Sequence, residues 1–262
     1  MLAQRVASAA VGIPIVLLLI VVGGAWYVAA VAAALAIASL EFQHARRFWL
    51  DPVGVLAALL AAGIAVGAHV GRVEWLAWIG AALVLMPLAA LLRPADGGGV
   101  VDVFWTLGGV TYVGFLGGFM VLLRDLDPDG RSWVLLAALS TFAVDTASFF
   151  VGRRWGRRLL APTISPKKTV EGFLGGYAAG FAAVVLLAAV FDLGVGAGRI
   201  ALLGALLPPI AAFGDLGESA IKRAMGIKDA SQLIPGHGGV LDRLDSILFT
   251  FALVYLFTQW AL

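Results

Sequence analysis

Three aspartates near the end of the 262-residue chain could bind a metal ion. Asp215 directly follows one uncharged run and Asp242 opens the next. Asp242 and Asp245 are three positions apart, which places them on one face of a helix. Mg²⁺ uses one or two carboxylates and leaves its other positions to water and substrate phosphates. We therefore expect Asp215 and Asp242 to converge on magnesium, with Asp245 as a further ligand or part of a second metal site; simple capping of a helix start is the alternative.

A glycine-rich turn, Gly236 to Gly239, leads into the same predicted helix. Glycines let the backbone approach a ligand closely, and free N–H groups at a helix start attract phosphate. His237 could orient a phosphate or act as an acid, and a solvated loop histidine explains it equally well. Three basic residues precede the turn: Lys222, Arg223 and Lys228. The segment therefore predicts a phosphate-binding site.

A second polar segment, Gly152 to Gly172, carries six positive charges and one negative charge. Its arginines could simply bind anionic lipid headgroups. The stretch Ser165-Pro166-Lys167-Lys168-Thr169 is different, because a proline-rigidified turn with two lysines and two hydroxyls can grip phosphates. We predict that this stretch contacts substrate.

The chain that must position these residues is strongly apolar. It is 61% hydrophobic and 13% charged, with a mean hydropathy of +0.99, which excludes an ordinary soluble domain. A membrane-spanning helix needs roughly 20 apolar residues. The uncharged runs therefore predict an all-α, polytopic integral membrane protein with about nine transmembrane helices. The predicted spans are a helical hairpin over Val6 to Leu40 that turns near Gly23 and Gly24, Pro52 to Gly71, Trp75 to Leu92, Val103 to Leu123, Ser132 to Gly152, Gly172 to Phe191, Ile200 to Gly214 and Ser246 to Leu262.

Asp145 is the one charge inside the predicted span Ser132 to Gly152. A carboxylate within a membrane is costly and marks a functional site by default. The stretch Glu41 to Arg47 is interpreted as a loop facing the headgroups. The polar loops Arg153 to Glu171 and Asp215 to Asp245 are the two long enough to build a site outside the bilayer.

The distribution of positive charge predicts the orientation. Of the 18 lysine and arginine residues, four fall on one side of the predicted spans: Arg72, Arg124, Arg131 and Arg199. The other fourteen fall on the opposite side, which the positive-inside rule assigns to the cytoplasm. We therefore expect a multi-pass protein of the cytoplasmic (inner) cell membrane with both long polar loops, and the active site, facing the cytoplasm. The chain has no cysteine, so disulfides and thiol chemistry are excluded.

These polar residues resemble the signature of the phosphatidate cytidylyltransferases, also called CDP-diacylglycerol synthases. The likeness is carried by Ser219, Lys222-Arg223, Lys228-Asp229, His237-Gly238-Gly239, Asp242-Arg243 and Asp245. The segment Ser165 to Gly172 and Asp145 with its following Gly-Arg-Arg loop also resemble the family. One departure is Thr146-Ala147-Ser148-Phe149, where a Gly-Ala-Tyr-like sequence is expected. The likeness is detailed over the C-terminal half, so we divide the chain into N-terminal helices (1–131) and C-terminal helices with catalytic loops (132–262), within one membrane domain.

The resemblance implies transfer of a cytidylyl group from CTP to phosphatidate in phospholipid biosynthesis, which gives CDP-diacylglycerol and pyrophosphate. It implies Mg²⁺ as cofactor, with Asp215, Asp242 and Asp245 as ligands. The implied catalytic residues are Asp215, Asp242, Asp245, Lys222 and His237. The implied substrate-binding residues are Ser165, Lys167, Lys168, Ser219, Arg223, Lys228, Gly238, Gly239, Arg243 and Asp145. The expected partners are CTP, phosphatidate and membrane lipids but no nucleic acid, and a homodimer is left open.

Two alternatives belong to other functional classes. A secondary transporter would use Asp145 to bind a coupling ion near the middle of the membrane. Another lipid or polyprenol phosphotransferase would use a different nucleotide. The polar residues concentrate in loops at one membrane face, where a soluble nucleotide can meet a lipid headgroup, and this favours an enzyme.

Overall fold

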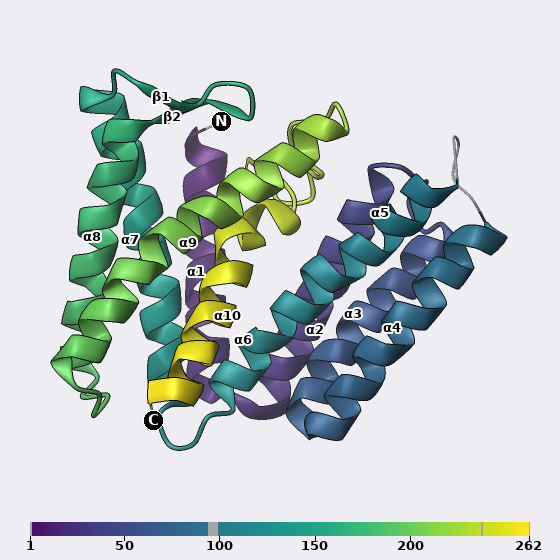
Figure 1. Ribbon diagram of the computed structural model, residues 1–262, viewed down its shortest axis with the longest axis horizontal. Coiled ribbons are helices and arrows are strands. Elements are labelled where there is room, and N and C mark those ends of the chain that lie inside the picture. Colours follow the sequence, from purple (N-terminus) through teal and green to yellow (C-terminus); the bar gives the residue numbers. More distant parts are fainter. Residues whose placement is uncertain (1, 94–98, 237, 262) are drawn as a thin grey trace. The chain divides into compact units, whose positions relative to one another are not determined.

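The computed structural model describes residues 2–93, 99–236 and 238–261, which are almost entirely helical (Figure 1). The helices are α1 (Leu2–Val22), α2 (Gly24–His44), α3 (Pro52–Val70), α4 (Arg72–Leu92), α5 (Val100–Val110), a π-helical turn η1 (Thr111–Phe115), α6 (Leu116–Arg124), α7 (Gly130–Trp155), α8 (Val170–Val190), α9 (Ala197–Ala224) and α10 (Leu241–Ala261). The strands β1 (Leu159–Ala161) and β2 (Ser165–Thr169) form one antiparallel hairpin.

The predicted all-α, polytopic membrane class is confirmed. Among the described residues, eight helices are long and apolar enough to cross a membrane, with α5, η1 and α6 forming one of them as a continuous rod. The helix α1 adds a shorter apolar stretch, Ala10–Val22. The predicted break near Gly23 is also confirmed, because α1 ends at Val22 and α2 begins at Gly24. Gly23 there has φ of 68°, a conformation that favours glycine.

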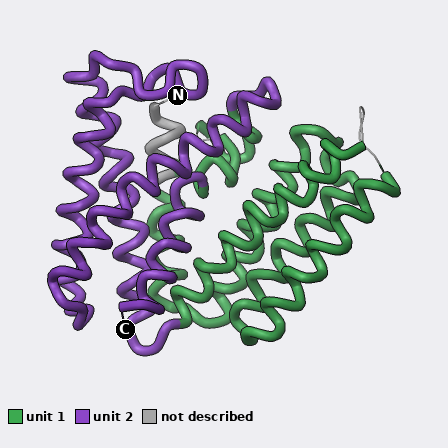
Figure 2. Tube along the Cα trace, in the orientation of Figure 1, with its two compact units in different colours: residues 1–125, 229–244 green, residues 126–228, 245–262 purple. Residues whose placement is uncertain are grey.

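The chain forms two compact units (Figure 2). Unit 1 comprises residues 1–125 and 229–244, and unit 2 comprises residues 126–228 and 245–262. In unit 1, α2, α3, α4 and the α5–η1–α6 rod pack together. The centre of this packing is a cluster of buried apolar side chains: Val53, Ala57, Leu60, Ile64, Ala82, Met86 and Val110. Segment 229–244, although distant in sequence, belongs to the same unit.

In unit 2, α8 packs closely against α7 along a row of glycines. Gly172, Gly176 and Gly180 follow one another at intervals of four residues, the spacing that lets two membrane helices approach. A Cβ atom at Gly176 would lie 2.8 Å from the Val144 carbonyl oxygen of α7. The β1–β2 hairpin connects these two helices, so their close packing fixes its base.

The other helices of unit 2 are tied together by polar contacts. The hydroxyl of Thr141 on α7 donates to that of Thr250 on α10, at 2.9 Å. Arg199 at the start of α9 donates to the Ala261 carbonyl at the end of α10, at 2.7 Å. These bonds join α7 to α10 and α9 to α10.

Three predicted loops are in part regular structure. The span predicted to end at Gly214 continues as α9 to Ala224, so Asp215 lies on a helix and not in a loop. The stretch from Ser165 to Thr169 is a strand rather than a turn. The helix α2 extends to His44, well into the stretch expected to be a headgroup-facing loop. Every predicted span except Ser132 to Gly152 was ended at the first charge, whereas a helix continues wherever its polar side chains find partners.

Candidate functional site

The centre of the polar site in unit 2 is an ion pair between β2 and α9. The Nζ atom of Lys168 lies 2.5 Å from an Asp215 carboxylate oxygen. The Ser219 hydroxyl, one turn further along α9, lies 3.5 Å from the other oxygen of Asp215. Both charged side chains are 27–30% exposed, so the pair is open to solvent and to ligands. The structure therefore brings together three residues predicted from two separate polar segments.

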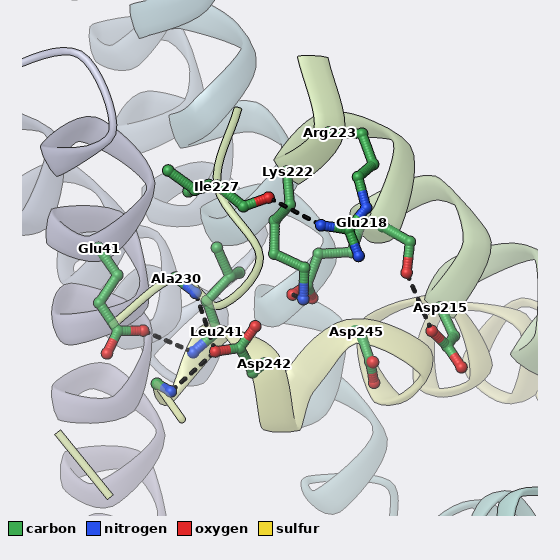
Figure 3. Close-up of polar contacts among 12 residues, drawn as sticks. Glu41, Asp215, Glu218, Lys222, Arg223, Ile227, Ala230, Leu241, Asp242 and Asp245 are labelled. Carbon is green, nitrogen blue, oxygen red and sulfur yellow. Dashed lines mark hydrogen bonds and ion pairs between the residues drawn. The ribbon is translucent and has the colours of Figure 1, made fainter. Parts of the chain in front are cut away.

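A second group of contacts extends this site toward the end of α9. The ammonium group of Lys222 donates to the Glu218 carboxylate at 2.8 Å, and the Glu218 side chain is buried. Arg223 donates to the carbonyl of Ile164 in the hairpin at 3.3 Å, and to that of Ile227 at 3.2 Å (Figure 3). The hairpin is thereby fastened to the last turns of α9.

The hairpin is also fastened to α8. Thr169 caps this helix, because its hydroxyl accepts a hydrogen bond from the Gly172 N–H at 3.1 Å. The Glu171 carboxylate accepts from the backbone N–H groups of Arg157 and Arg158, at 2.9 and 3.2 Å. The one acidic residue of this basic segment therefore holds the backbone. The position of Lys168 is fixed by these caps as well as by its ion pair.

In unit 1, Asp242 closes the glycine-rich turn. One oxygen of its carboxylate accepts from the N–H groups of Ala230 at 3.0 Å and Gly239 at 2.8 Å, and the side chain is 6% exposed. Gly238 has φ of 83°, a conformation that glycine adopts without strain. A bridge between Ile234 and Gly238 completes the turn. Asp242 therefore has a structural role whether or not it also binds a metal.

Glu41 of α2 holds the same turn from the other direction. Its carboxylate accepts from the Ser231 hydroxyl at 2.6 Å and from the N–H groups of Val240 at 3.0 Å and Leu241 at 2.7 Å. Figure 3 shows the Glu41 side chain directed at the start of α10. The helix-start N–H groups that the sequence predicted for phosphate are thus given to a carboxylate of the protein. The negative charge suits the positive end of the α10 dipole.

The remaining predicted residues occupy less constrained positions. Lys167, Lys228 and Arg243 are exposed, on β2, after α9 and on α10. Asp145 lies inside α7 with an exposed side chain, and the Ser165 side chain on β2 is partly buried. Asp245 accepts a hydrogen bond from the Ser246 N–H at 2.6 Å. His237 lies outside the described residues.

The carboxylates predicted to bind a metal ion do not form a complete set of ligands in the structure. Among the described residues, no three histidine, aspartate or glutamate side chains cluster closely enough to hold a metal ion. Asp215 and Asp242 belong to different units, so their convergence on one ion stays a prediction.

Two site residues escaped the sequence reasoning. Glu41 and Glu218 are both buried, at 0% and 1% exposure. The rule that singled out Asp145, that a carboxylate in or beside an apolar span needs a reason, applies equally to Glu41. Glu41 directly follows the longest uncharged run of the chain, and this position could have marked it as a site residue. Glu218 stands four residues before Lys222, a spacing that pairs opposite charges on a helix.

Comparison with known proteins gives one consistent result. The sequence model described as "Cytidylyltransferase family" matches residues 3–261. The phosphatidate cytidylyltransferase of Brucella suis biovar 1 (strain 1330) is 40% identical over 153 residues, 58% of this chain and 56% of that protein. That of Bacillus subtilis (strain 168) is 37% identical over 152 residues, again 58% and 56%. These alignments span just over half of each relative, whereas the enzyme of that name from Synechocystis sp. (strain ATCC 27184 / PCC 6803 / Kazusa) is 33% identical over 97% of this chain and 95% of its own length.

Proposed function

The chain belongs to the cytidylyltransferase family, and from this premise we propose that it transfers the cytidylyl group of CTP to phosphatidate. An oxygen of the phosphatidate phosphate attacks the α-phosphorus of CTP. The bond between that phosphorus and the oxygen bridging to the β-phosphate breaks. The products are CDP-diacylglycerol and pyrophosphate. Because phosphatidate is already ionised near neutral pH, the attack needs no strong general base.

The chemical difficulty is electrostatic. Phosphatidate and CTP are both anions that must come together, and negative charge builds up on the departing pyrophosphate. Positioned cations lower that barrier, and losing one such contact commonly costs 10²-fold or more in rate. The observation that carries the proposal is the pair of Lys168 with Asp215, joined by Ser219. It combines a cation suited to binding phosphate and a carboxylate suited to binding a metal ion at one partly exposed position. Lys222 and Arg223, both about one turn beyond Ser219 on α9, supply additional positive charge.

We propose Mg²⁺ as the cofactor, since the acidic and hydroxyl oxygens of this group are the donors that it prefers. Asp215 would hold the ion together with Asp242, and Asp245 would add a ligand. Substrate phosphates and water would fill the positions that these carboxylates leave open. When bound, the ion would neutralise charge on the CTP phosphates and on the departing pyrophosphate.

The test is a synthesis assay with the purified full-length protein. With CTP, MgCl₂ and phosphatidate in mixed micelles, we expect stoichiometric CDP-diacylglycerol and pyrophosphate, measured by mass spectrometry and by a coupled pyrophosphate assay. Excess EDTA should abolish the reaction, and added Mg²⁺ should restore it. Equal turnover with ATP would contradict the proposed nucleotide and favour a different phosphotransferase. Full activity in EDTA would contradict the metal assignment.

A further inference from the structure

We infer that Glu41 is a positioning residue, whose carboxylate fixes the glycine-rich turn and the first turn of α10. The effect on catalysis rests on the function proposed above, whereas the contacts stand on the structure alone. Glu41 lies at the end of α2, in a part of the sequence that contains none of the predicted site residues. It connects that part to the segment that resembles the family signature.

The contacts of Glu41 converge on one segment. One carboxylate oxygen accepts from the Ser231 hydroxyl and the Val240 N–H, and the other accepts from the Leu241 N–H. The side chain is fully buried, and no lysine or arginine forms an ion pair with it among the described residues. A buried charge without a counter-ion requires good hydrogen bonds to persist. Here those bonds come from the two ends of the turn, so the carboxylate sets the distance between them.

We call the hydrogen bonds of Glu41 to Ser231, Val240 and Leu241 the clamp, and Asp242 complements it. It accepts from the N–H groups of Ala230 and Gly239, next to the groups that Glu41 binds. Two carboxylates from different helices therefore occupy the consecutive backbone donors of residues 239–241. A phosphate approaching this turn must use other donors, which assigns Glu41 to shaping the turn and not to contacting substrate.

The clamp also explains why glycine stands at position 239. A Cβ atom there would lie 2.6 Å from the nearer Glu41 carboxylate oxygen and 2.7 Å from the other. Such distances are well below van der Waals contact, and the residue itself is buried. Glycine is thus required by the approach of the glutamate, independently of any ligand.

Hydrogen–deuterium exchange on the full-length protein in detergent tests the clamp directly. In Glu41→Gln and Glu41→Ala, we expect the backbone amides of residues 239–241 to exchange at least about 10-fold faster than in the wild-type protein. The increase should be larger in Glu41→Ala, because glutamine keeps one acceptor oxygen. In the synthesis assay, kcat should fall by about 100-fold, as small misplacements of reacting groups do. The KM for phosphatidate should stay within about twofold, since Glu41 is assigned no substrate contact.

Asp102→Asn provides the matched control. Asp102 is an equally buried carboxylate of unit 1, and it pairs with Arg47. This variant should lower thermal stability but leave both the exchange at 239–241 and kcat unchanged at temperatures well below unfolding. If the Glu41 variants do not fold, Ser231→Ala removes one donor and should give a smaller increase in exchange of the same amides.

Each outcome bears on a different statement. Unchanged exchange at residues 239–241 in a Glu41 variant overturns the clamp. Faster exchange with unchanged kcat overturns the positioning role. A loss of kcat that Asp102→Asn reproduces would show general destabilisation, which also overturns it. If the wild-type protein makes no CDP-diacylglycerol, the proposed function fails, and the exchange result still decides the clamp.

Discussion

Asp242 has a structural role in the turn and a proposed role in metal binding, and a single substitution can separate the two. Its hydrogen bonds to Ala230 and Gly239 use one oxygen, and asparagine can keep an acceptor there. Asp242→Asn therefore preserves most of the turn and removes the negative charge. If Asp242 binds the metal, turnover should fall by about 100-fold or more in a folded protein. CDP-diacylglycerol synthesis and a thermal unfolding measurement on the same preparation check this.

Asp145→Asn is the companion variant, because it distinguishes an enzyme from a transporter. We expect it to reduce synthesis less than Asp242→Asn does, since Asp145 lies within α7, before the basic hairpin begins. In a transporter, the two substitutions would affect transport in the reverse order. Asp145, inside the span, would be essential, and Asp242, at the helix start, would be dispensable. Near-normal synthesis by Asp242→Asn at unchanged stability would make Asp215 and Asp245 the next pair to test.

The two neighbouring lysines of β2 differ in their surroundings and should differ in their kinetics. Lys168 pairs with Asp215, whereas Lys167 is exposed and makes no ion pair among the described residues. Lys168→Met should lower kcat by about 10–100-fold, because it removes a positioned cation beside Asp215 that is proposed to stabilise the reacting phosphates. Lys167→Met should mainly raise the KM for CTP or phosphatidate. Steady-state kinetics with each substrate varied in turn measure both, and equal effects on kcat would contradict the special role of the ion pair.

At the scale of elements, the glycine row of α8 determines where the hairpin stands. Gly176→Ala places a methyl group against the Val144 carbonyl and the Ser148 side chain of α7. Overpacking of this kind costs about 1–3 kcal/mol, against a helix-propensity gain of up to about 1 kcal/mol. Gly80→Ala in α4 is the control, since nothing lies within 4 Å of a Cβ there.

We expect Gly176→Ala to unfold at a lower temperature than Gly80→Ala in the same detergent, by tryptophan fluorescence. It should also reduce synthesis, because α7 and α8 carry the two ends of the hairpin that presents Lys168. Equal unfolding temperatures for the two variants would show that α7 and α8 tolerate separation.

The sequence predicted the elements well where hydrophobicity decides them. A run of about 20 apolar residues has few alternatives to a helix in a membrane, so spans such as Pro52–Val70 were placed to within a residue or two. The sequence predicted the ends of the helices poorly. The helix α9 runs on through Asp215 to Ala224, because Lys222 pairs with Glu218 and Arg223 reaches the hairpin, and such tertiary partners cannot be read from apolar runs.

The candidate site shows the same division. Lys168, Asp215 and Ser219 were identified from residue types and from the resemblance to the family, and the structure brings them together. Glu41 was missed, because its partners lie about 190–200 positions away along the chain. A contact of that separation depends on the packing of whole helices, about which spacing along the sequence carries no information.

For the whole molecule, the decisive property is its orientation in the membrane. The family assignment and the apolar helices support a multi-pass membrane protein. Within unit 2, the bonds of Lys168 and Arg223 place the basic hairpin and the end of α9 at one end of the helices. That end carries most of the unit's positive charge, and CTP is a cytoplasmic metabolite. We therefore propose that this end faces the cytoplasm.

Thiol labelling tests the orientation in a chain that has no cysteine of its own. We place single cysteines at three exposed positions. These are Thr163 in the hairpin, Gln232 shortly before the glycine-rich turn, and Asp127 between α6 and α7. In right-side-out spheroplasts, a membrane-impermeant maleimide should label Asp127→Cys at once but Thr163→Cys and Gln232→Cys only after permeabilisation, because the positive-inside rule retains the basic loops in the cytoplasm. Retained synthesis activity is the control that each variant is folded. Labelling of Thr163→Cys or Gln232→Cys from outside would reverse the orientation, and it would separate the proposed site from the cytoplasmic nucleotide on which the reaction depends.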